Sequence, residues 1–213
     1  MMRDSYLVLL VVVSMPAAMG LDAAWGAPGA ACAGAAAWAV LAALLARAST
    51  TVRRQTCVAV AVAVCGELLA SLLLHAYTYT RGAIPWYVPP GHGILFLGLR
   101  ALARAPLWTR RGAVWGIGAA VAAWAGASAA FRGDAVSGFL LLAFGAFVAL
   151  GRAPPQLYLS AFFATSYLEE LGTRLGCWRW APLDPVLGLS QANPPALVVG
   201  FYCIFIEAAL AIG

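Results

Sequence analysis

The chain has 213 residues, of which 63% are hydrophobic and 10% are charged. Soluble domains carry about 25% charged residues, so this composition excludes an ordinary soluble fold and predicts a protein embedded in a membrane. The formal net charge is +5, and all thirteen of the Lys and Arg residues are Arg. They fall in short segments between apolar runs, which is typical of membrane topology. We therefore predict no nucleic-acid partner.

A membrane-spanning helix needs about 17 to 25 predominantly apolar residues, and eight segments meet that requirement. In chain order they are residues 5–22, 29–47, 55–77, 88–104, 112–131, 135–151, 155–176 and 194–213. The sequence predicts an all-α, polytopic transmembrane helical bundle of about eight spans, with residues 1–213 forming a single integral membrane domain.

Two of these segments have alternative interpretations. The first could be a signal peptide, because Arg3 precedes its apolar core. The fourth begins at Pro89-Pro90-Gly91-His92 and contains Arg100, which also suits a short span or a re-entrant element. If either segment fails to span, seven spans remain.

The Arg residues also predict orientation, because Arg accumulates on the cytoplasmic side of membrane proteins. If both termini are cytoplasmic, eight fall on the cytoplasmic side: Arg3, Arg47, Arg53, Arg54, Arg104, Arg110, Arg111 and Arg152. Four fall on the opposite side: Arg81, Arg132, Arg174 and Arg179. Abundant Ala and the absence of Lys indicate a GC-rich bacterial genome. We therefore predict a multi-pass protein of the bacterial inner membrane with both termini cytoplasmic.

Four carboxyl groups lie inside apolar stretches, those of Glu67, Glu169, Glu170 and Glu207. A charge at the bilayer centre costs about 2.5 to 3.5 kcal/mol on insertion scales, so such a group usually faces a protein interior or a wet cavity and has a partner. These residues predict a polar site inside the bundle.

In the third segment, Glu67 and His75 lie eight residues apart, with Ser71 midway. This helical spacing places all three on one stripe facing other helices. Glu67 then belongs either to a functional cavity or to a hydrogen-bonded clamp between helices.

The following segment, Tyr77 to His92, is aromatic and rich in proline. Tyr79 and Trp86 suit an interfacial aromatic belt or a binding site. Pro89-Pro90-Gly91 stiffens the backbone ahead of His92. His92 is thereby predicted at the mouth of the fourth span as a proton shuttle, a metal ligand or a helix cap.

The seventh segment carries a polar stripe of Thr165, Glu169 and Thr173, while Glu170 is spaced to pair with Arg174. Glu169 has no such local partner and is the better candidate for a reactive buried carboxyl. Trp178 follows on the same predicted outer side, at the depth of His75, His92 and Glu169.

The last loop contains Asn193-Pro194-Pro195, in which Asn193 is predicted to cap the eighth helix. Glu207 falls in the inner half of that helix and is predicted to pair with another helix or with an inner-leaflet Arg such as Arg100. The catalytic candidates are Glu67, His92 and Glu169. The binding candidates are His75, Tyr79, Trp86, Thr173, Trp178 and Asn193. The two His residues lack metal-site spacing, and we predict neither a metal nor a cofactor.

The segments Tyr77 to His92, Gly172 to Trp180 and Asn193 to Pro195 resemble a group of uncharacterised bacterial polytopic membrane proteins. That group carries a Pro-Pro-Gly-His segment, a Gly-Thr-x-x-Gly-x-Trp-x-Trp segment and an Asn-Pro-Pro segment. Gly172 to Trp180 is also similar to a short motif of membrane carotenoid hydratases and cyclases. The second resemblance implies a substrate that lies within the lipid.

Three functions fit the sequence. The first is an intramembrane enzyme for a polyene or isoprenoid, with Glu67 and Glu169 as proton donor and acceptor and His92 between them. The second is a proton-coupled transporter or channel. The third is a structural or assembly protein whose polar residues clamp helices. The expected partners are membrane lipid and a lipophilic small molecule, and the sequence leaves the oligomeric state open.

Overall fold

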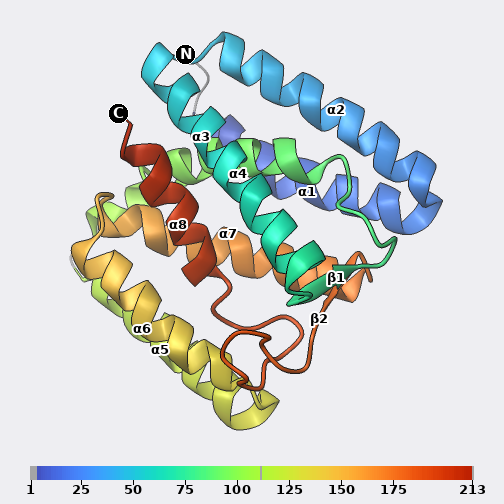
Figure 1. Cartoon of the computed structure of the whole chain (residues 1–213). Coiled ribbons are helices and arrows are strands. Elements are labelled where there is room, and N and C mark those ends of the chain that lie inside the picture. The colour runs from blue at the N-terminus through green and yellow to red at the C-terminus, as the bar shows by residue number, and fades with distance from the viewer. Residues whose placement is uncertain (1–3, 111, 213) are drawn as a thin grey trace.

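The computed structural model describes residues 4–110 and 112–212, so Arg3 and Arg111 of the predicted topology lie outside the described residues. The described chain is all-α apart from two short strands (Figure 1). Its α-helices are α1 (Asp4–Trp25), α2 (Ala27–Ala46), α3 (Thr50–Glu67), α4 (Val88–Leu102), α5 (Ala113–Arg132), α6 (Ala135–Leu150), α7 (Pro155–Arg174) and α8 (Val199–Leu210). A π-helix, Leu68–Leu73, extends α3, and a short 3-10 helix, Pro106–Thr109, precedes α5. The strands are β1 (Tyr77–Tyr79) and β2 (Trp178–Trp180).

Four helical segments in the described residues are long and apolar enough to cross a membrane. They are α1, α2, α5 and the combined segment Thr50–Leu73. The apolar helices α6 and α8 have 16 and 12 residues. Their lengths are roughly 24 and 18 Å at helical rise, less than the bilayer core of about 30 Å. The apolar helices indicate a membrane protein, and the full count of eight spans stays a prediction.

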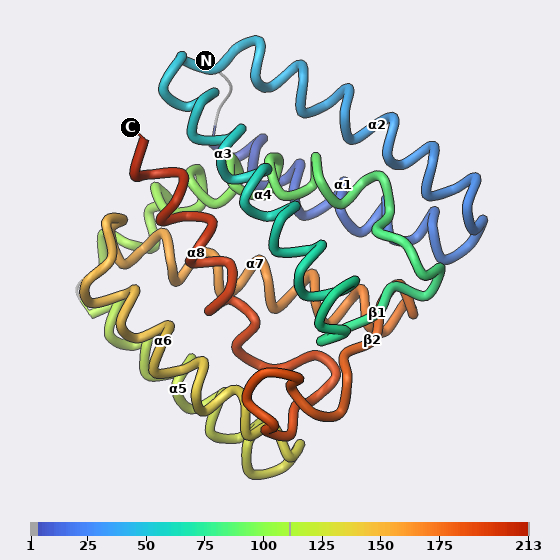
Figure 2. Tube along the Cα trace, viewed as in Figure 1, coloured from blue at the N-terminus to red at the C-terminus, as the bar shows by residue number. Residues whose placement is uncertain are grey.

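The surface of the bundle is apolar in a way that suits lipid. Trp115, Phe131, Leu142 and Leu150 are between 75% and 88% exposed on α5 and α6. Soluble monomers seldom expose contiguous apolar surface on this scale. In the interior, α4 lies among α1, α2, α3 and α7, and α8 lies between α3 and α6 (Figure 2).

The two ends of the bundle are tied by separate ion pairs. At one end Arg104 binds Asp4 at 2.7 Å, which joins the end of α4 to the start of α1. At the other end Arg81 binds Asp22 at 2.7 Å, which joins the loop after β1 to the end of α1. The beginning of α1 and the end of α8 lie toward the same end (Figure 1), an arrangement compatible with termini on one side of a membrane.

Glu207 pairs with another helix and with an Arg predicted on the cytoplasmic side, as expected, but that Arg is Arg152, whose Nε lies 3.6 Å from Oε2, and not Arg100. Glu207 accepts hydrogen bonds from the Tyr158 hydroxyl and from the Arg152 backbone N–H, the latter at 2.9 Å. Arg100 instead donates to the side chain of Gln55 at 2.9 Å. Glu207 lies near the end of α8, beside the turn between α6 and α7. That turn carries Arg152, whereas Arg100 lies on α4.

The predicted eighth span, residues 194–213, is also shorter than expected, because α8 begins only at Val199. The backbone N–H groups of Ala196 and Leu197 donate to the side chains of Asp134 and Ser137. These bonds hold the residues before α8 in a buried turn. Asn193 therefore does not cap α8.

The strands bring together the two aromatic loops. β1 and β2 pair antiparallel, with Tyr77 opposite Trp180 and Tyr79 opposite Trp178. We call this two-stranded unit the aromatic ribbon. Both loops thus lie at the same end of the bundle, at the ends of α3 and α7 (Figure 1). Hydropathy predicted helices alone, and the strand pairing explains how the loops are held over the helices.

Candidate functional site

The aromatic ribbon directs four side chains into the protein. Successive residues of a strand point to opposite faces, so Tyr77, Tyr79, Trp178 and Trp180 lie on the inner face, while Thr78 and Arg179 are exposed. The inner side chains carry two hydroxyl and two indole N–H donors. The ribbon therefore presents four hydrogen-bond donors to the ends of α3 and α7.

Glu67, the last residue of α3, receives two of these donors. The hydroxyls of Tyr77 and Tyr79 donate to its Oε2 at 2.5 and 2.7 Å, and Nε2 of His92 lies 3.1 Å from its Oε1. Burial, followed by the charge of Glu67, raises the pKa of both tyrosines well above the usual range of a phenol. Both therefore stay protonated and remain donors. Glu67 is buried, with all its partners supplied by segments that follow it in the chain.

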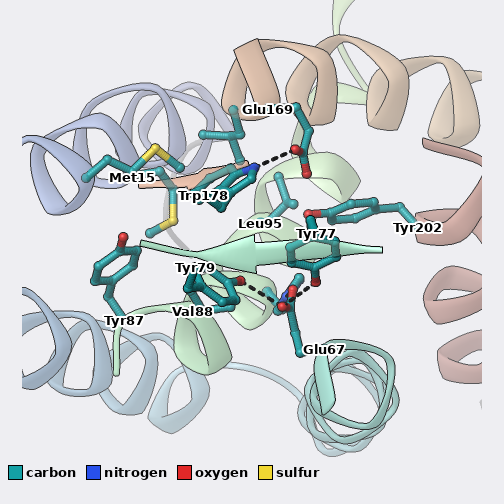
Figure 3. A pocket seen from close by; sticks show the side chains of 14 residues that line it. Met15, Glu67, Tyr77, Tyr79, Tyr87, Val88, Leu95, Glu169, Trp178 and Tyr202 are labelled. Atoms are coloured by element: carbon teal, nitrogen blue, oxygen red, sulfur yellow. Dashed lines mark hydrogen bonds and ion pairs between the residues drawn. The ribbon is translucent and has the colours of Figure 1, made fainter. Parts of the chain in front are cut away.

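Glu169 of α7 receives the other two donors, both on one oxygen. The indole N–H groups of Trp178 and Trp180 donate to Oε2 at 2.9 and 3.1 Å. Oε1 accepts no hydrogen bond from the described residues, and Figure 3 shows it directed toward the space between Tyr202 and Tyr77. Glu169 is buried, with one oxygen fixed and the other open to a pocket.

The two carboxyl groups border one small pocket, which we call the polar pocket. Its volume is about 60 Å³, and liquid water occupies about 30 Å³ per molecule. Leu168 and the ribbon side chains of Tyr77, Tyr79 and Trp178 also line it. Met15, Leu95 and Tyr202 complete its walls (Figure 3). The Tyr77 and Trp180 ring centroids, 4.7 Å apart, join the two halves. The polar pocket has room for water beside two carboxyl groups, but not for a lipid.

His92 enters the site from the first turns of α4. Pro89 and Pro90 occupy the opening positions of this helix, where a missing N–H costs nothing. The His92 ring packs on Tyr202 and Phe205 of α8, with centroids 5.6 and 5.7 Å away. Among the described residues His92 hydrogen-bonds to Glu67 and not to Glu169, and its position between the two carboxyls stays a prediction.

The sequence-predicted site residues divide into two groups. Glu67, Tyr79, His92, Glu169 and Trp178 all line the polar pocket. His75, Trp86, Thr173 and Asn193 lie outside it.

His75 is exposed and has a positive φ of 53°. Its predicted stripe with Glu67 assumed 3.6 residues per turn, but Leu68–Leu73 is a π-helix with wider turns. The helix also ends at Leu73, so His75 lies outside it and off the predicted stripe. Ser71 remains buried and donates to the backbone carbonyl of Glu67 at 2.7 Å.

The other three outlying residues have structural roles. Trp86 is 73% exposed, packs against Gly34 of α2 and suits an interfacial belt. Thr173 donates to the Glu169 backbone carbonyl within its own helix at 2.8 Å. The side-chain oxygen of Asn193 accepts from the Trp180 backbone N–H at 2.9 Å, so it holds the ribbon without touching the pocket.

Sequence reasoning missed Tyr77, Trp180 and Tyr202 as site residues. For the first two a signal was present, because Tyr-Thr-Tyr and Trp-Arg-Trp alternate with the period of a strand. Tyr202 lies in a uniformly apolar helix, and its position at the polar pocket follows only from the packing of α8.

Gly172 controls how closely Trp178 approaches α7. A Cβ atom at this position would overlap with the indole ring of Trp178 at Cη2. Replacing Gly172 by Ala is expected to displace the indole and destabilise the protein by about 1 to 3 kcal/mol through overpacking. Thermal unfolding of the purified protein in one detergent would measure the change.

Gly145 provides the matched control, because a Cβ there meets nothing within 4 Å. Gly145→Ala is expected to leave stability unchanged or raise it by up to about 1 kcal/mol through helix propensity. Equal stability of the Gly172→Ala variant and the wild type would contradict the close packing of Trp178.

The arrangement can exchange protons in an enclosed space. One carboxyl group has three hydrogen-bonding neighbours, including a histidine, and the other has a free oxygen. No family model, curated protein or solved structure matches the chain.

Proposed function

We propose that the protein is an intramembrane enzyme that performs acid–base chemistry on a lipophilic substrate of the isoprenoid or carotenoid type. Glu169 is the proton donor, and the Glu67–His92 pair is the acceptor. The observation that carries this assignment is the free oxygen of Glu169 in a pocket shared with Glu67. Two carboxyl groups in different surroundings are the usual arrangement for separate acid and base roles.

The reaction class is proton transfer to and from a carbon–carbon double bond. The proton of the Glu169 carboxylic acid bonds to one alkene carbon, which leaves a carbocation at the other and a carboxylate on Glu169. Loss of a proton from a neighbouring carbon to the Glu67–His92 pair gives an isomer. Attack by water, with its proton passing to the same pair, gives an alcohol. Return of that proton to Glu169 through the polar pocket restores the starting state.

The side chains around the reacting centre would favour this chemistry. Tyr77 and Tyr202 line the polar pocket with aromatic rings, and aromatic faces attract positive charge. The Trp178 and Trp180 N–H groups stabilise the carboxylate form of Glu169 after it releases its proton. The small volume of the polar pocket limits competing reactions with bulk water.

A purely structural role is the main alternative, because the same hydrogen bonds also clamp the ribbon to α3 and α7. Lipid extracts of cells with and without the gene distinguish the two. The enzyme hypothesis predicts that a lipophilic substrate accumulates and its product disappears when the gene is absent. Identical extracts, together with proton flux in vesicles containing the purified protein, would favour the transporter alternative instead.

We also propose that the bundle spans the bacterial inner membrane about eight times, with both termini cytoplasmic and the aromatic ribbon on the opposite side. The Arg distribution supports this orientation. Single cysteines introduced at the exposed Thr78 and Arg179, in a background without native cysteines, are expected to react with an impermeant maleimide from the periplasm. A cysteine at exposed Arg53 is expected to react only after the cells are opened. The reverse pattern would invert the topology.

A further inference from the structure

A second, much larger cavity adjoins the polar pocket. Its volume is about 590 Å³, and it lies between α3 with its π-helical extension, α6, α8 and the turn Asp184–Leu187. We call it the lateral groove. Glu67, Tyr77, Glu169 and Tyr202 line both the lateral groove and the polar pocket, so these four side chains form the boundary between them.

Away from this boundary the lateral groove is lined mainly by apolar side chains that face outward from the bundle. Cys65 and Leu69 belong to the α3 side, and Phe201 and Ile204 belong to α8; all four are exposed. In a membrane, outward-facing apolar side chains of these helices contact lipid. The lateral groove is therefore open to the hydrocarbon region at its side.

The charges along the lateral groove are of one sign. Glu67, Glu169 and Asp184 are acidic, and no Arg, Lys or His occurs among the described residues that line it. Asp184 uses its carboxyl group to accept the N–H groups of Val186 and Leu187 at 3.0 and 2.7 Å. Phosphate recognition relies on Arg, Lys or clustered N–H donors. The lining thus disfavours a phosphorylated or otherwise anionic lipid.

The two cavities differ in the size of molecule that they can hold. Small-molecule sites have volumes of about 300 to 1,000 Å³, a range that includes the lateral groove and excludes the polar pocket. A hydrocarbon chain fits the lateral groove, and only water fits the polar pocket beside it. A chain in the lateral groove would bring its atoms to Tyr202 and the free oxygen of Glu169.

We infer that the lateral groove binds the hydrocarbon chain of an uncharged lipid, which reaches it sideways from the bilayer between α3 and the pair α6 and α8. The chain rests on the apolar walls, with one segment against the boundary formed by Glu67, Tyr77, Glu169 and Tyr202. The assignment of that segment as the reacting part rests on the proposed function. The binding of the chain does not, because it follows from the lining alone.

Photo-crosslinking tests the inference directly. The purified full-length protein, in phosphatidylcholine nanodiscs, is irradiated with a hexadecanol analogue that carries a diazirine in its chain, and the labelled peptides are identified by mass spectrometry. Labelling is expected to concentrate on the lining segments of α3 and α8. Excess hexadecanol is expected to abolish it, whereas excess hexadecyl phosphate is not.

Two matched variants separate groove binding from general contact with lipid. Cys65→Trp places a large side chain in the lateral groove, whereas Cys57→Trp places it at an exposed position of the same helix outside the groove. Loss of competable labelling is expected for the first and wild-type labelling for the second. Equal labelling of both variants, or labelling spread over all lipid-facing helices, would overturn the inference.

Further outcomes also decide it. Competition by hexadecyl phosphate as strong as that by hexadecanol would overturn the restriction to uncharged lipids. Labelling of the groove that disappears as the protein is reconstituted at several copies per nanodisc would show a second copy of the chain as its occupant. The Glu169→Gln variant should still be labelled, because it retains the groove. Failure of chain binding is therefore distinguishable from failure of the acid–base mechanism, which is read from lipid products.

Discussion

The Glu169→Gln variant is expected to lose activity by about 100-fold or more, the usual contribution of a positioned acid or base, while the protein stays folded in the membrane. Gln keeps the shape and an oxygen that accepts the N–H groups of Trp178 and Trp180, which now bind Oε2 at 2.9 and 3.1 Å. It cannot release a proton. The measurement is the amount of lipophilic product formed by membranes that contain equal amounts of each variant.

Glu170→Gln is the matched control. Glu170 neighbours Glu169 in sequence but binds Arg132 and Arg174, at 3.1 and 3.3 Å, away from the polar pocket. This variant is expected to keep wild-type activity. Full activity of Glu169→Gln would eliminate the acid–base mechanism and leave the clamp as the role of Glu169.

Glu67→Gln is expected to abolish activity as well, with some loss of stability. Glu67 receives two tyrosine hydroxyls on one oxygen and His92 on the other. An amide has one acceptor oxygen where the carboxylate has two, so it cannot accept from the tyrosine hydroxyls on one atom and from His92 on the other. Activity retained in this variant would remove Glu67 from the proposed proton path.

The largest loss of stability is expected at Asp134, which is fully buried in the turn between α5 and α6. Its Oδ2 accepts hydrogen bonds from the hydroxyls of Ser128 and Ser137 and from the N–H of Ala196, at 2.8, 2.6 and 2.8 Å. Asp134→Ala leaves these buried donors without an acceptor, at about 1 to 3 kcal/mol for each unsatisfied group. We expect the free energy of unfolding to fall by at least about 3 kcal/mol.

Asp4→Ala provides the comparison for this prediction. Asp4 also binds a neighbour, but its side chain and that of Arg104 are 45% and 53% exposed, and exposed ion pairs contribute about 0 to 1 kcal/mol. Thermal and chemical unfolding in the same detergent would give both values. Equal effects of the two substitutions would contradict the role of Asp134 in fixing the turn before α8.

Hydropathy predicted the positions of the helices because membrane helices bury their backbone in long apolar segments. Residue counting also placed His75, His92, Glu169 and Trp178 at one depth, and the structure brings His92, Glu169 and Trp178, but not His75, to one pocket. Depth follows from counting residues at a constant rise per residue. Glu170 pairs with Arg174, as its spacing of four residues predicted.

The rest of the site depended on departures from regular helices. A π-helix after Glu67 changes the phase of the residues that follow it, which removes His75 from the site and leads into β1. The strands are only three residues long, so their alternation was hidden within an aromatic segment typical of a membrane interface. Asn193 binds a backbone N–H thirteen residues earlier, a contact that depends on the tertiary fold.

The most direct test of proton transfer to carbon uses deuterium. Membranes containing the wild-type protein or the Glu169→Gln variant are incubated in D₂O with a lipid extract from cells that lack the gene, and the lipids are then analysed by mass spectrometry. The proposed mechanism predicts a lipid product with non-exchangeable deuterium in the wild-type sample and its absence from the variant. Deuterium contents that are identical in every lipid of the two samples would contradict the mechanism.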